Sequence, residues 1–158
     1  MQLLITGGDC AIARVAIAHL RASFQLRVVD TRFASPLPDP VDAQTGDLRD
    51  EAFLERILSG VEAVLHFAPL SLTLKTDLEN LDHTLLGTHR LAHVAQQQRV
   101  GRIILGSSMS LFASAPQQWA IVENWRPRPQ PHLRDLCAWL AECCLRELAR
   151  DGGVSTLC

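Results

Sequence analysis

The 158-residue chain has the length of one domain, large enough to bury roughly two-thirds of the surface that its unfolded chain exposes. Its formal net charge of −2 excludes the strongly charged surfaces that bind nucleic acid or anionic membranes, and its longest uncharged apolar stretch, residues 63–74, is too short to span a bilayer. The first residues lack the basic region of a signal peptide, so we expect a cytoplasmic protein.

The five cysteines predict reduced thiols. Cys10, Cys137, Cys143, Cys144 and Cys158 form no CxxC pair, and their odd number without a secretion signal argues against a disulfide framework. Cys143 and Cys144 are adjacent in an expected helix and therefore point to different faces, so we expect small core or interface residues there rather than a metal clip.

Strands and helices alternate along the whole chain. Apolar runs predict strands and helical spacing predicts helices, in the chain order strand 2–6, helix 12–22, strands 26–30 and 42–46, helix 50–58, strand 61–67, helix 75–98, strand 102–107, helix 134–150 and strand 154–157. In the helix at 75–98 we expect Leu78, Leu81, Leu85 and Ala92 to face the sheet. Near-continuous apolar strands separated by helices indicate a parallel sheet covered on both faces. The prediction is a doubly wound parallel α/β sheet, the Rossmann fold, over residues 1–158.

A Thr-Gly-Gly turn follows the first strand. Residues 1–13 run from an apolar strand through Thr6-Gly7-Gly8 into a helix. In βαβ units of this kind, backbone N–H groups at the helix N-terminus hold a pyrophosphate, and we expect those of Cys10, Ala11 and Ile12 to do so. Taken alone, such a turn is also common as a purely structural feature.

Asp30 strengthens the prediction of a dinucleotide site. It ends the second strand, 23 residues after Gly7, where a carboxylate can accept hydrogen bonds from the 2′- and 3′-hydroxyls of a ribose. Arg32 could instead meet a 2′-phosphate. We favour NAD over NADP, because Asp30 would repel that phosphate.

Further motifs follow in a recognisable order over nearly the whole chain. They are Thr6-Gly7-Gly8, Gly46-Asp47-Leu48-Arg49-Asp50, His66-Phe67-Ala68, Leu86-Gly87-Thr88, residues 102–108 and residues 121–129. In order and spacing they resemble the extended short-chain dehydrogenase/reductases, specifically the NAD-dependent epimerase/dehydratase group that acts on sugar nucleotides.

The resemblance implies roles for individual residues. Asp47 and Leu48 would flank the adenine, and Phe67 and Ala68 would lie along the ribose and nicotinamide side of the cofactor. Ser108 would hydrogen-bond the reacting hydroxyl or carbonyl of a nucleotide sugar or other small ligand. A polar strand end is the alternative interpretation of Ser108.

The glycine turn departs from the family pattern. It has the sequence Gly7-x-x-Cys10-x-x-Ala13, where the family usually has three glycines. An alanine at position 13 still allows close packing of helix and strand. The Cys10 side chain, however, would intrude where the backbone approaches the pyrophosphate, so we expect cofactor binding to be weakened or lost.

The family's Tyr-x-x-x-Lys pair is missing. The chain contains no tyrosine and a single lysine, Lys75, and alignment of residues 142–148 puts Arg134 at the tyrosine position and Ala138 at the lysine position. Positioned proton transfer is commonly worth about 10² to 10⁴-fold in rate, so we expect catalysis to be impaired. Thr84 stands where the family often has asparagine. The chain also stops near its sixth strand, so we expect no substrate domain.

Histidines and tryptophans offer weaker alternatives. His132 could replace the missing base, or be an exposed loop histidine. His89 and His93 are four apart on a helix, a spacing that can hold a metal, but no third ligand is evident and surface or interface histidines are favoured. Trp119 and Trp125 could line a pocket or pack the long loop that holds them.

Three functions therefore stay open. The first is an NAD(P)-binding relative with impaired catalysis, acting as a sensor or as the partner of an active homologue. The second is an active oxidoreductase or epimerase that uses Ser108 and an unconventional base such as His132. The third is an interaction domain without cofactor. The resemblance also implies a homodimer through the two long helices, with Leu86, Leu136 and Leu140 facing outward.

Overall fold

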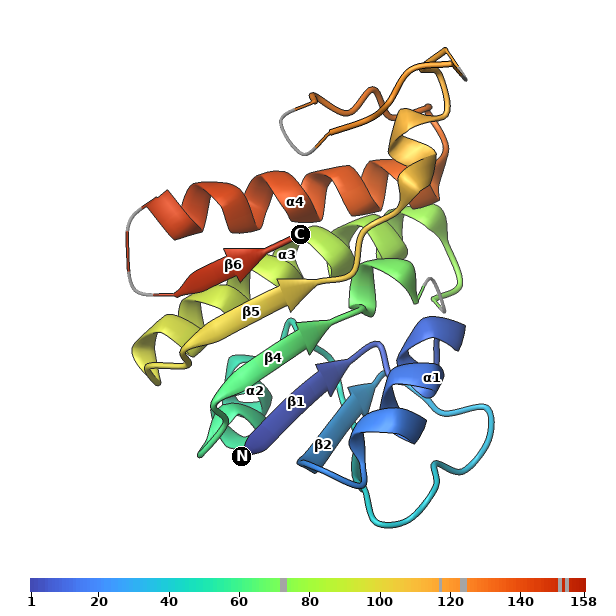
Figure 1. Ribbon diagram of the computed structural model, residues 1–158. Coiled ribbons are helices and arrows are strands. Elements are labelled where there is room, and N and C mark those ends of the chain that lie inside the picture. The colour runs from blue at the N-terminus through green and yellow to red at the C-terminus, as the bar shows by residue number, and fades with distance from the viewer. Residues whose placement is uncertain (72–73, 117, 123–124, 151, 153) are drawn as a thin grey trace.

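The fold is a six-stranded, wholly parallel sheet with the strand order β3-β2-β1-β4-β5-β6 (Figure 1). The computed structural model describes residues 1–71, 74–116, 118–122, 125–150, 152 and 154–158. The strands are β1 (Gln2–Thr6), β2 (Gln25–Asp30), β3 (Asp42–Thr45), β4 (Ala63–His66), β5 (Arg102–Leu105) and β6 (Ser155–Leu157). The strand order reverses between β1 and β4, which is where open parallel sheets bind ligands. The predicted doubly wound fold is confirmed.

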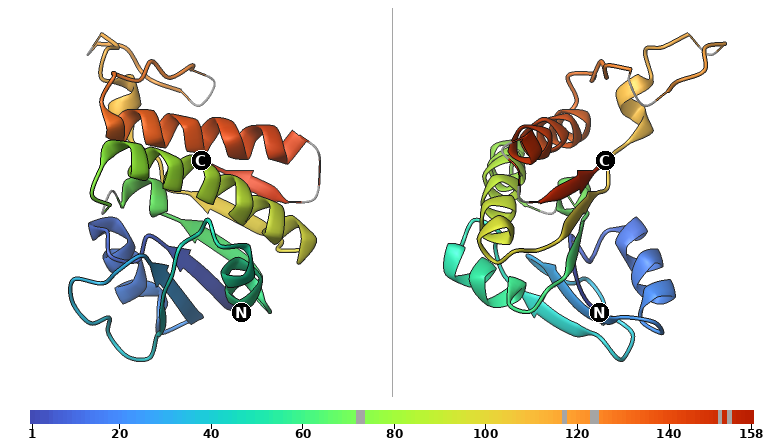
Figure 2. Two further views of the ribbon diagram at one scale, coloured as in Figure 1. Left: turned by 180° about the vertical axis from the view of Figure 1, so that it is seen from behind. Right: turned by 60° about the vertical axis from the view of Figure 1, so that its left-hand side comes forward.

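Helices connect the strands on both faces of the sheet. They are α1 (Ala11–Leu20), α2 (Glu51–Leu58), α3 (Asp77–Gln97) and α4 (Leu133–Arg150), with short 3₁₀ helices η1 (Ala68–Leu70) after β4 and η2 (Met109–Phe112) after β5. Figure 2 shows α2, α3 and α4 together on one face and α1 on the opposite face. Within the described residues, no helix combines the length and apolarity needed to cross a membrane.

The core has two layers because successive side chains of a buried strand point to opposite faces. Leu4 of β1 packs with Leu54 and Leu91 on the face covered by α2, α3 and α4. Its neighbour Ile5 packs with Ile17 of α1 on the other face. Burial on both faces explains why these strands are continuous apolar runs in the sequence.

The expected sheet-facing stripe of α3 is largely wrong. Leu78 and Leu85 are 75% and 43% exposed, and only Ala92 of the four residues is buried. The inward side of the first half of α3 consists of polar and small residues, and α3 as a whole packs against α4, α2 and η1. Its buried residues include Asn80, His83, Thr84, Gly87 and Thr88.

A buried hydrogen-bond chain joins β1, β4 and α3 at the carboxyl end of the sheet. Thr6 Oγ1 lies 2.6 Å from His66 Nδ1, and His66 Nε2 lies 2.9 Å from Thr88 Oγ1. His66 is completely buried. Desolvation lowers its pKa from 6.5 to about 3, with a smaller contribution from His83, so the imidazole is neutral in the folded protein.

We expect the free energy of unfolding to fall as the pH drops from 6.5 toward 3. The pKa of His66 is lower in the folded than in the unfolded chain, so acid is taken up preferentially by the unfolded state, at up to about 1.4 kcal/mol per pH unit. The stabilisation is complete above the unfolded pKa and is lost below it. The pKa of His83 is also lowered by burial, and its contribution has the same sign.

Urea unfolding of the wild type and His66→Gln, at about pH 7 and about pH 5, measures this dependence. The variant should be less stable at the higher pH by about 1–3 kcal/mol, because it disturbs a buried hydrogen-bond chain, yet should lose less stability in acid. An identical loss in both proteins would contradict the assignment to His66.

Candidate functional site

The turn after β1 lies in contact with the chain that follows β4. Gly7 has a φ of +70°, and a Cβ built on it would lie 2.5 Å from Ala68 N and from Phe67 C. Only glycine meets both conditions without strain. The Phe67 N–H donates to Thr6 O at 2.9 Å, which fixes the same approach.

Helix α1 begins beside this turn without a capping side chain. Its N-cap residue Cys10 makes no cap hydrogen bond, and the first turn contains no acidic residue. Ala11 and Ile12 are exposed. The Cys10 amide, one of the three expected to hold a pyrophosphate, donates to Gly7 O at 3.1 Å. The amides of Ala11 and Ile12, at the positive end of the helix dipole, are the ones left for an anion.

The Cys10 side chain lies close to those amides. Burial raises the pKa of its thiol, outweighing the opposite effect of the Ala13 and Ile12 amides, so the group is a neutral thiol. Part of the side chain packs against the apolar layer under α1. An anion that approaches the helix N-terminus meets this thiol.

Asp30 is held in one orientation at the end of β2. It is only 6% exposed, and Asp30 Oδ2 accepts hydrogen bonds from the Asp9 amide and from Ser71 Oγ, both at 3.0 Å. The Thr31 amide donates to Asp30 Oδ1 at 2.7 Å. Sequence reasoning identified Asp30 but missed Ser71, which reaches it from the segment after η1.

A narrow recess of about 10 Å³ lies between Asp30 and the Gly7 turn. Its other lining residues are Val29, Thr31, Gly46, Leu48, Ala68, Ser71 and His83. The structure thus brings four residues of the expected cofactor site to one recess: Gly7, Asp30, Leu48 and Ala68. The ring of Phe67 lies instead over Gly106, where an added Cβ would be 2.3 Å from Phe67 Cδ1.

His83 lines the recess with an unpartnered nitrogen. Its Nε2 is buried and makes no hydrogen bond to any described residue, and the nearest carboxylate oxygen, Asp47 Oδ1, is 3.7 Å away. Desolvation lowers the pKa of His83, so the ring is neutral and can donate or accept one hydrogen bond there. A buried polar atom left without a partner costs about 1–3 kcal/mol, and a ligand in the recess would relieve this cost.

Asp47 and Arg32 are not among the residues that line the recess, although Asp47 lies beside His83. Asp47 Oδ2 pairs with Arg49 at 2.7 Å, and Arg49 together with His83 keeps the Asp47 pKa low against the opposing effect of burial. Arg32 is exposed and does not line the recess. Its charge acts on Asp9, whose pKa is lowered mainly by the hydrogen bond from Arg14.

A wider cleft of about 500 Å³ continues from the N-terminus of α1 toward α4. It is lined by Asp9, Cys10, Ala11, Ile12, Leu70, Ser71, Ser107, Ser108 and Arg134. Ser108 and Arg134 therefore share the cleft with the free end of α1. Ala138 is fully buried one turn further along α4, and the exposed His132 is not among the lining residues.

Two buried carboxylates of α4 stand behind the cleft serines. Ser107 Oγ donates to Glu142 Oε1, and Ser108 Oγ lies 2.7 Å from Ser110 Oγ. Ser110 Oγ in turn donates to Asp135 Oδ1 at 2.5 Å. Sequence reasoning missed both acids. Their spacing of seven residues, which places them on one face of a helix, was the available signal.

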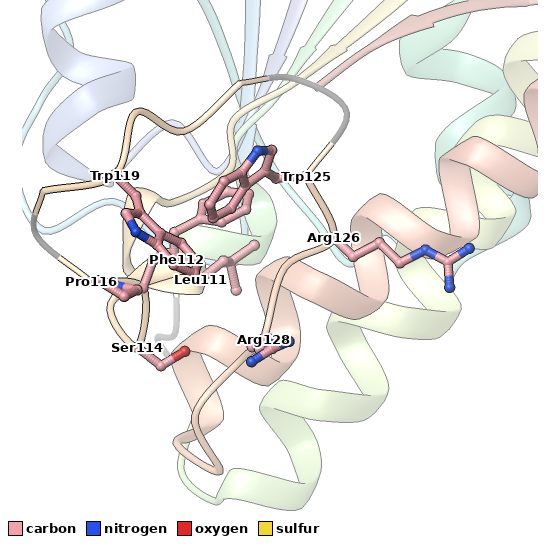
Figure 3. A pocket seen from close by; sticks show the side chains of 9 residues that line it. Leu111, Phe112, Ser114, Pro116, Trp119, Trp125, Arg126 and Arg128 are labelled. Carbon is pink, nitrogen blue, oxygen red and sulfur yellow. The ribbon is translucent and has the colours of Figure 1, made fainter.

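The two tryptophans of the loop between η2 and α4 pack against each other, and they also line a separate hollow of about 270 Å³ (Figure 3). Their rings meet edge to face with centroids 5.5 Å apart. The figure shows Trp119 and Trp125 beside Phe112, with Arg126 pointing away from them. Neither tryptophan lines the cleft. Residues 123 and 124 of the expected motif at 121–129 lie outside the described residues.

His89 and His93 are exposed on α3 with stacked rings whose centroids are 6.4 Å apart. In the part of the chain that the structure describes, no three His, Cys, Asp or Glu side chains are grouped to hold a metal ion.

Comparison with known proteins relates the chain to two kinds of enzyme. A uronate dehydrogenase from Pseudomonas syringae pv. tomato is 29% identical over 133 residues, covering 83% of this chain and 48% of that protein. A UDP-glucose 4-epimerase from Streptomyces lividans is 28% identical over 138 residues, covering 81% of this chain and 42% of that protein. The chain therefore spans slightly less than half the length of these relatives.

A solved structure and a family-wide sequence model agree with this relationship. A short-chain dehydrogenase/reductase superfamily protein from Agrobacterium tumefaciens with bound NAD superposes with a TM-score of 0.81 at 25% identity, over 99% of this chain and 47% of that one. The model of the NAD dependent epimerase/dehydratase family matches residues 3–134. The chain belongs to the NAD dependent epimerase/dehydratase family.

Proposed function

We propose that this chain, as one Rossmann domain, binds NAD across the carboxyl ends of β1, β2 and β4 and lacks the proton transfer of its family. The observation that carries the proposal is the recess beside Gly7, where the Asp30 carboxylate is fixed and His83 Nε2 has no partner among the described residues. Bound NAD supplies a hydride acceptor. The NAD complex of the Agrobacterium relative supports this choice of cofactor.

The residues fit the cofactor with two local adjustments. The hydroxyls of a ribose would replace Ser71 Oγ on Asp30 and widen the narrow recess. The pyrophosphate would take the amides of Ala11 and Ile12 at the start of α1, and the Cys10 side chain would turn aside to admit it. A side chain held away from its preferred rotamer costs of order 0.5–1.5 kcal/mol, so Cys10 should weaken binding rather than abolish it.

Calorimetric titration with NAD⁺ tests the proposal, with Cys10→Gly as the companion variant. The wild type should bind saturably, and Cys10→Gly should bind about three- to tenfold more tightly because the obstructing side chain is gone. Glycine remains an acceptable N-cap, so the helix should persist. Exposed Cys158 provides a matched control, and Cys158→Ser should leave the affinity unchanged.

Absence of binding by both the wild type and Cys10→Gly would refute the cofactor proposal and favour the interaction domain without cofactor. Binding only by Cys10→Gly would assign the loss of cofactor to this thiol.

Asp30 should select NAD⁺ over NADP⁺. Its buried carboxylate would face a 2′-phosphate, and we expect NADP⁺ to bind at least about tenfold more weakly, which corresponds to roughly 1.4 kcal/mol. Asp30→Ser removes the charge but keeps an acceptor for the Asp9 amide. It should therefore reduce the preference for NAD⁺ over NADP⁺, chiefly by lowering the affinity for NAD⁺. Equal affinities of the wild type for both cofactors would contradict this role.

The chain has no tyrosine, so the family's phenol is not available at the reacting end of the cleft. Arg134 occupies the cleft at the tyrosine position, and a guanidinium stays protonated and cannot accept a proton. Ala138 offers no ammonium. The exposed position of His132 outside the cleft does not favour it as the replacement base.

Turnover should therefore be slow. With NAD⁺ and UDP-glucose or free uronic acids, we expect NADH formation about 10² to 10⁴-fold slower than in a relative that has the Tyr-x-x-x-Lys pair, assayed in parallel. His132→Ala should leave any residual rate unchanged. Turnover that matches the intact relative and disappears in His132→Ala would establish the active-enzyme alternative instead.

Two further roles follow from the resemblance. The ligand beside the cofactor would be a nucleotide sugar or another small molecule. Helices α3 and α4 would pair with those of a second copy, and the exposure of Leu78 and Leu85 on α3 supports this contact, because a dimer would cover them.

A further inference from the structure

The hydroxyl of Ser108 belongs to a hydrogen-bond chain that ends on a buried acid. Ser108 Oγ is 2.7 Å from Ser110 Oγ, and Ser110 Oγ is 2.5 Å from Asp135 Oδ1. The Ser110 amide also donates to Ser108 Oγ, at 3.2 Å. Asp135 is 6% exposed and does not line the cleft, and the hydrogen bonds of the two serines connect it to the cleft.

The direction of the chain follows from its acidic end. A carboxylate only accepts hydrogen bonds, so the proton of Ser110 points to Asp135. Ser110 Oγ must then accept the proton of Ser108. With its proton directed to Ser110 Oγ and one lone pair directed to the Ser110 amide, Ser108 has a single lone pair left. Toward the cleft, Ser108 is therefore an acceptor and not a donor.

Arg134 adds a positive charge to the same cleft. It lines the cavity with Ser108, and no acidic group of the described residues lies within ion-pairing distance of its guanidinium. A guanidinium binds carboxylates well because it presents several donors in one plane. The cleft thus offers an acceptor for a hydroxyl and a cation for an anionic group.

We propose that the cleft binds a small hydroxy acid, whose hydroxyl donates to Ser108 Oγ and whose carboxylate pairs with Arg134. Asp135 acts through Ser110 as a positioning residue that keeps Ser108 an acceptor, so the alcohol is preferred over the corresponding ketone. The inference rests on the proposed function of this cleft as the place of a ligand beside the cofactor.

Three carboxylates that differ at one carbon test the assignment. Phenylacetate has no oxygen there, mandelate has a hydroxyl and benzoylformate has a carbonyl. Their affinities are measured by ligand-observed NMR on the full chain, alone and saturated with NAD⁺. We expect mandelate to bind about three- to tenfold more tightly than phenylacetate, and benzoylformate no more tightly than phenylacetate.

Variants at Ser110 separate positioning from mere packing. Ser110→Ala frees the Ser108 proton to donate, so the preference for mandelate over benzoylformate should vanish or reverse. Ser110→Thr keeps the hydroxyl and should keep the preference. Ser108→Ala should remove the advantage of mandelate over phenylacetate. Exposed Ser114 supplies the matched control, since Ser114→Ala lies outside the hydrogen-bond chain and should change nothing.

The role of Arg134 is tested by changing the charge at position 134 and the charge of the ligand. Arg134→Gln should weaken all three carboxylates by a similar factor, about threefold or more, while the uncharged methyl mandelate binds both proteins equally. Arg134→Lys should restore part of the loss.

The outcomes are distinct. Equal binding of mandelate and phenylacetate, tighter binding of benzoylformate, or no binding of any carboxylate overturns the hydroxy-acid proposal. So does a preference for mandelate that survives unchanged in Ser110→Ala. Failure of NAD⁺ to bind, with the expected order of the three probes intact, overturns the cofactor proposal and leaves this inference standing.

Discussion

The Gly7 turn approaches the backbone of Phe67 and Ala68 so closely that a Cβ at Gly7 would lie 2.5 Å from it. This contact sets the spacing between the ends of β1 and β4. Behind it, the buried Thr6–His66–Thr88 chain ties the same strands to α3. Since η1 follows β4 directly, the contact also determines where Ser71 meets Asp30. The recess and the cleft both depend on this one approach of two backbones.

The two ends of the site differ in chemistry. Around Gly7 and Asp30, the residue types match those by which parallel α/β folds hold a dinucleotide. Around Ser108 the site contains a cation, Arg134, and two buried acids of α4, Asp135 and Glu142, that accept hydrogen bonds from neighbouring serines. Arg134 brings a positive charge and no lone pair that could accept a proton, while Asp135 accepts the hydrogen bond of Ser110 behind Ser108. The proposal of cofactor binding without the family's proton transfer rests on this difference between the two ends.

Local signals in the sequence were enough for the sheet and for the place of Asp30 at the end of β2. Each depends on periodicity or on a short motif. The hydrogen bonds of Ser71 to Asp30 and of Ser110 to Asp135 join segments far apart in the chain, so no local pattern predicts them. The prediction that the leucines of α3 face the sheet was wrong for a related reason. Periodicity identifies an apolar face, but the neighbouring element decides whether that face is covered.

The distribution of aromatic residues has an optical consequence. All three tryptophans, Trp119, Trp125 and Trp139, lie between η2 and the middle of α4, and the chain has no tyrosine to add to their emission. Ultraviolet fluorescence of this protein therefore arises from one side of the molecule. A conformational change in the long loop or in α4 should shift the wavelength or the intensity of this emission. The neighbourhood of β2 and β3 contains no indole, so a change confined to it should leave the emission unaltered.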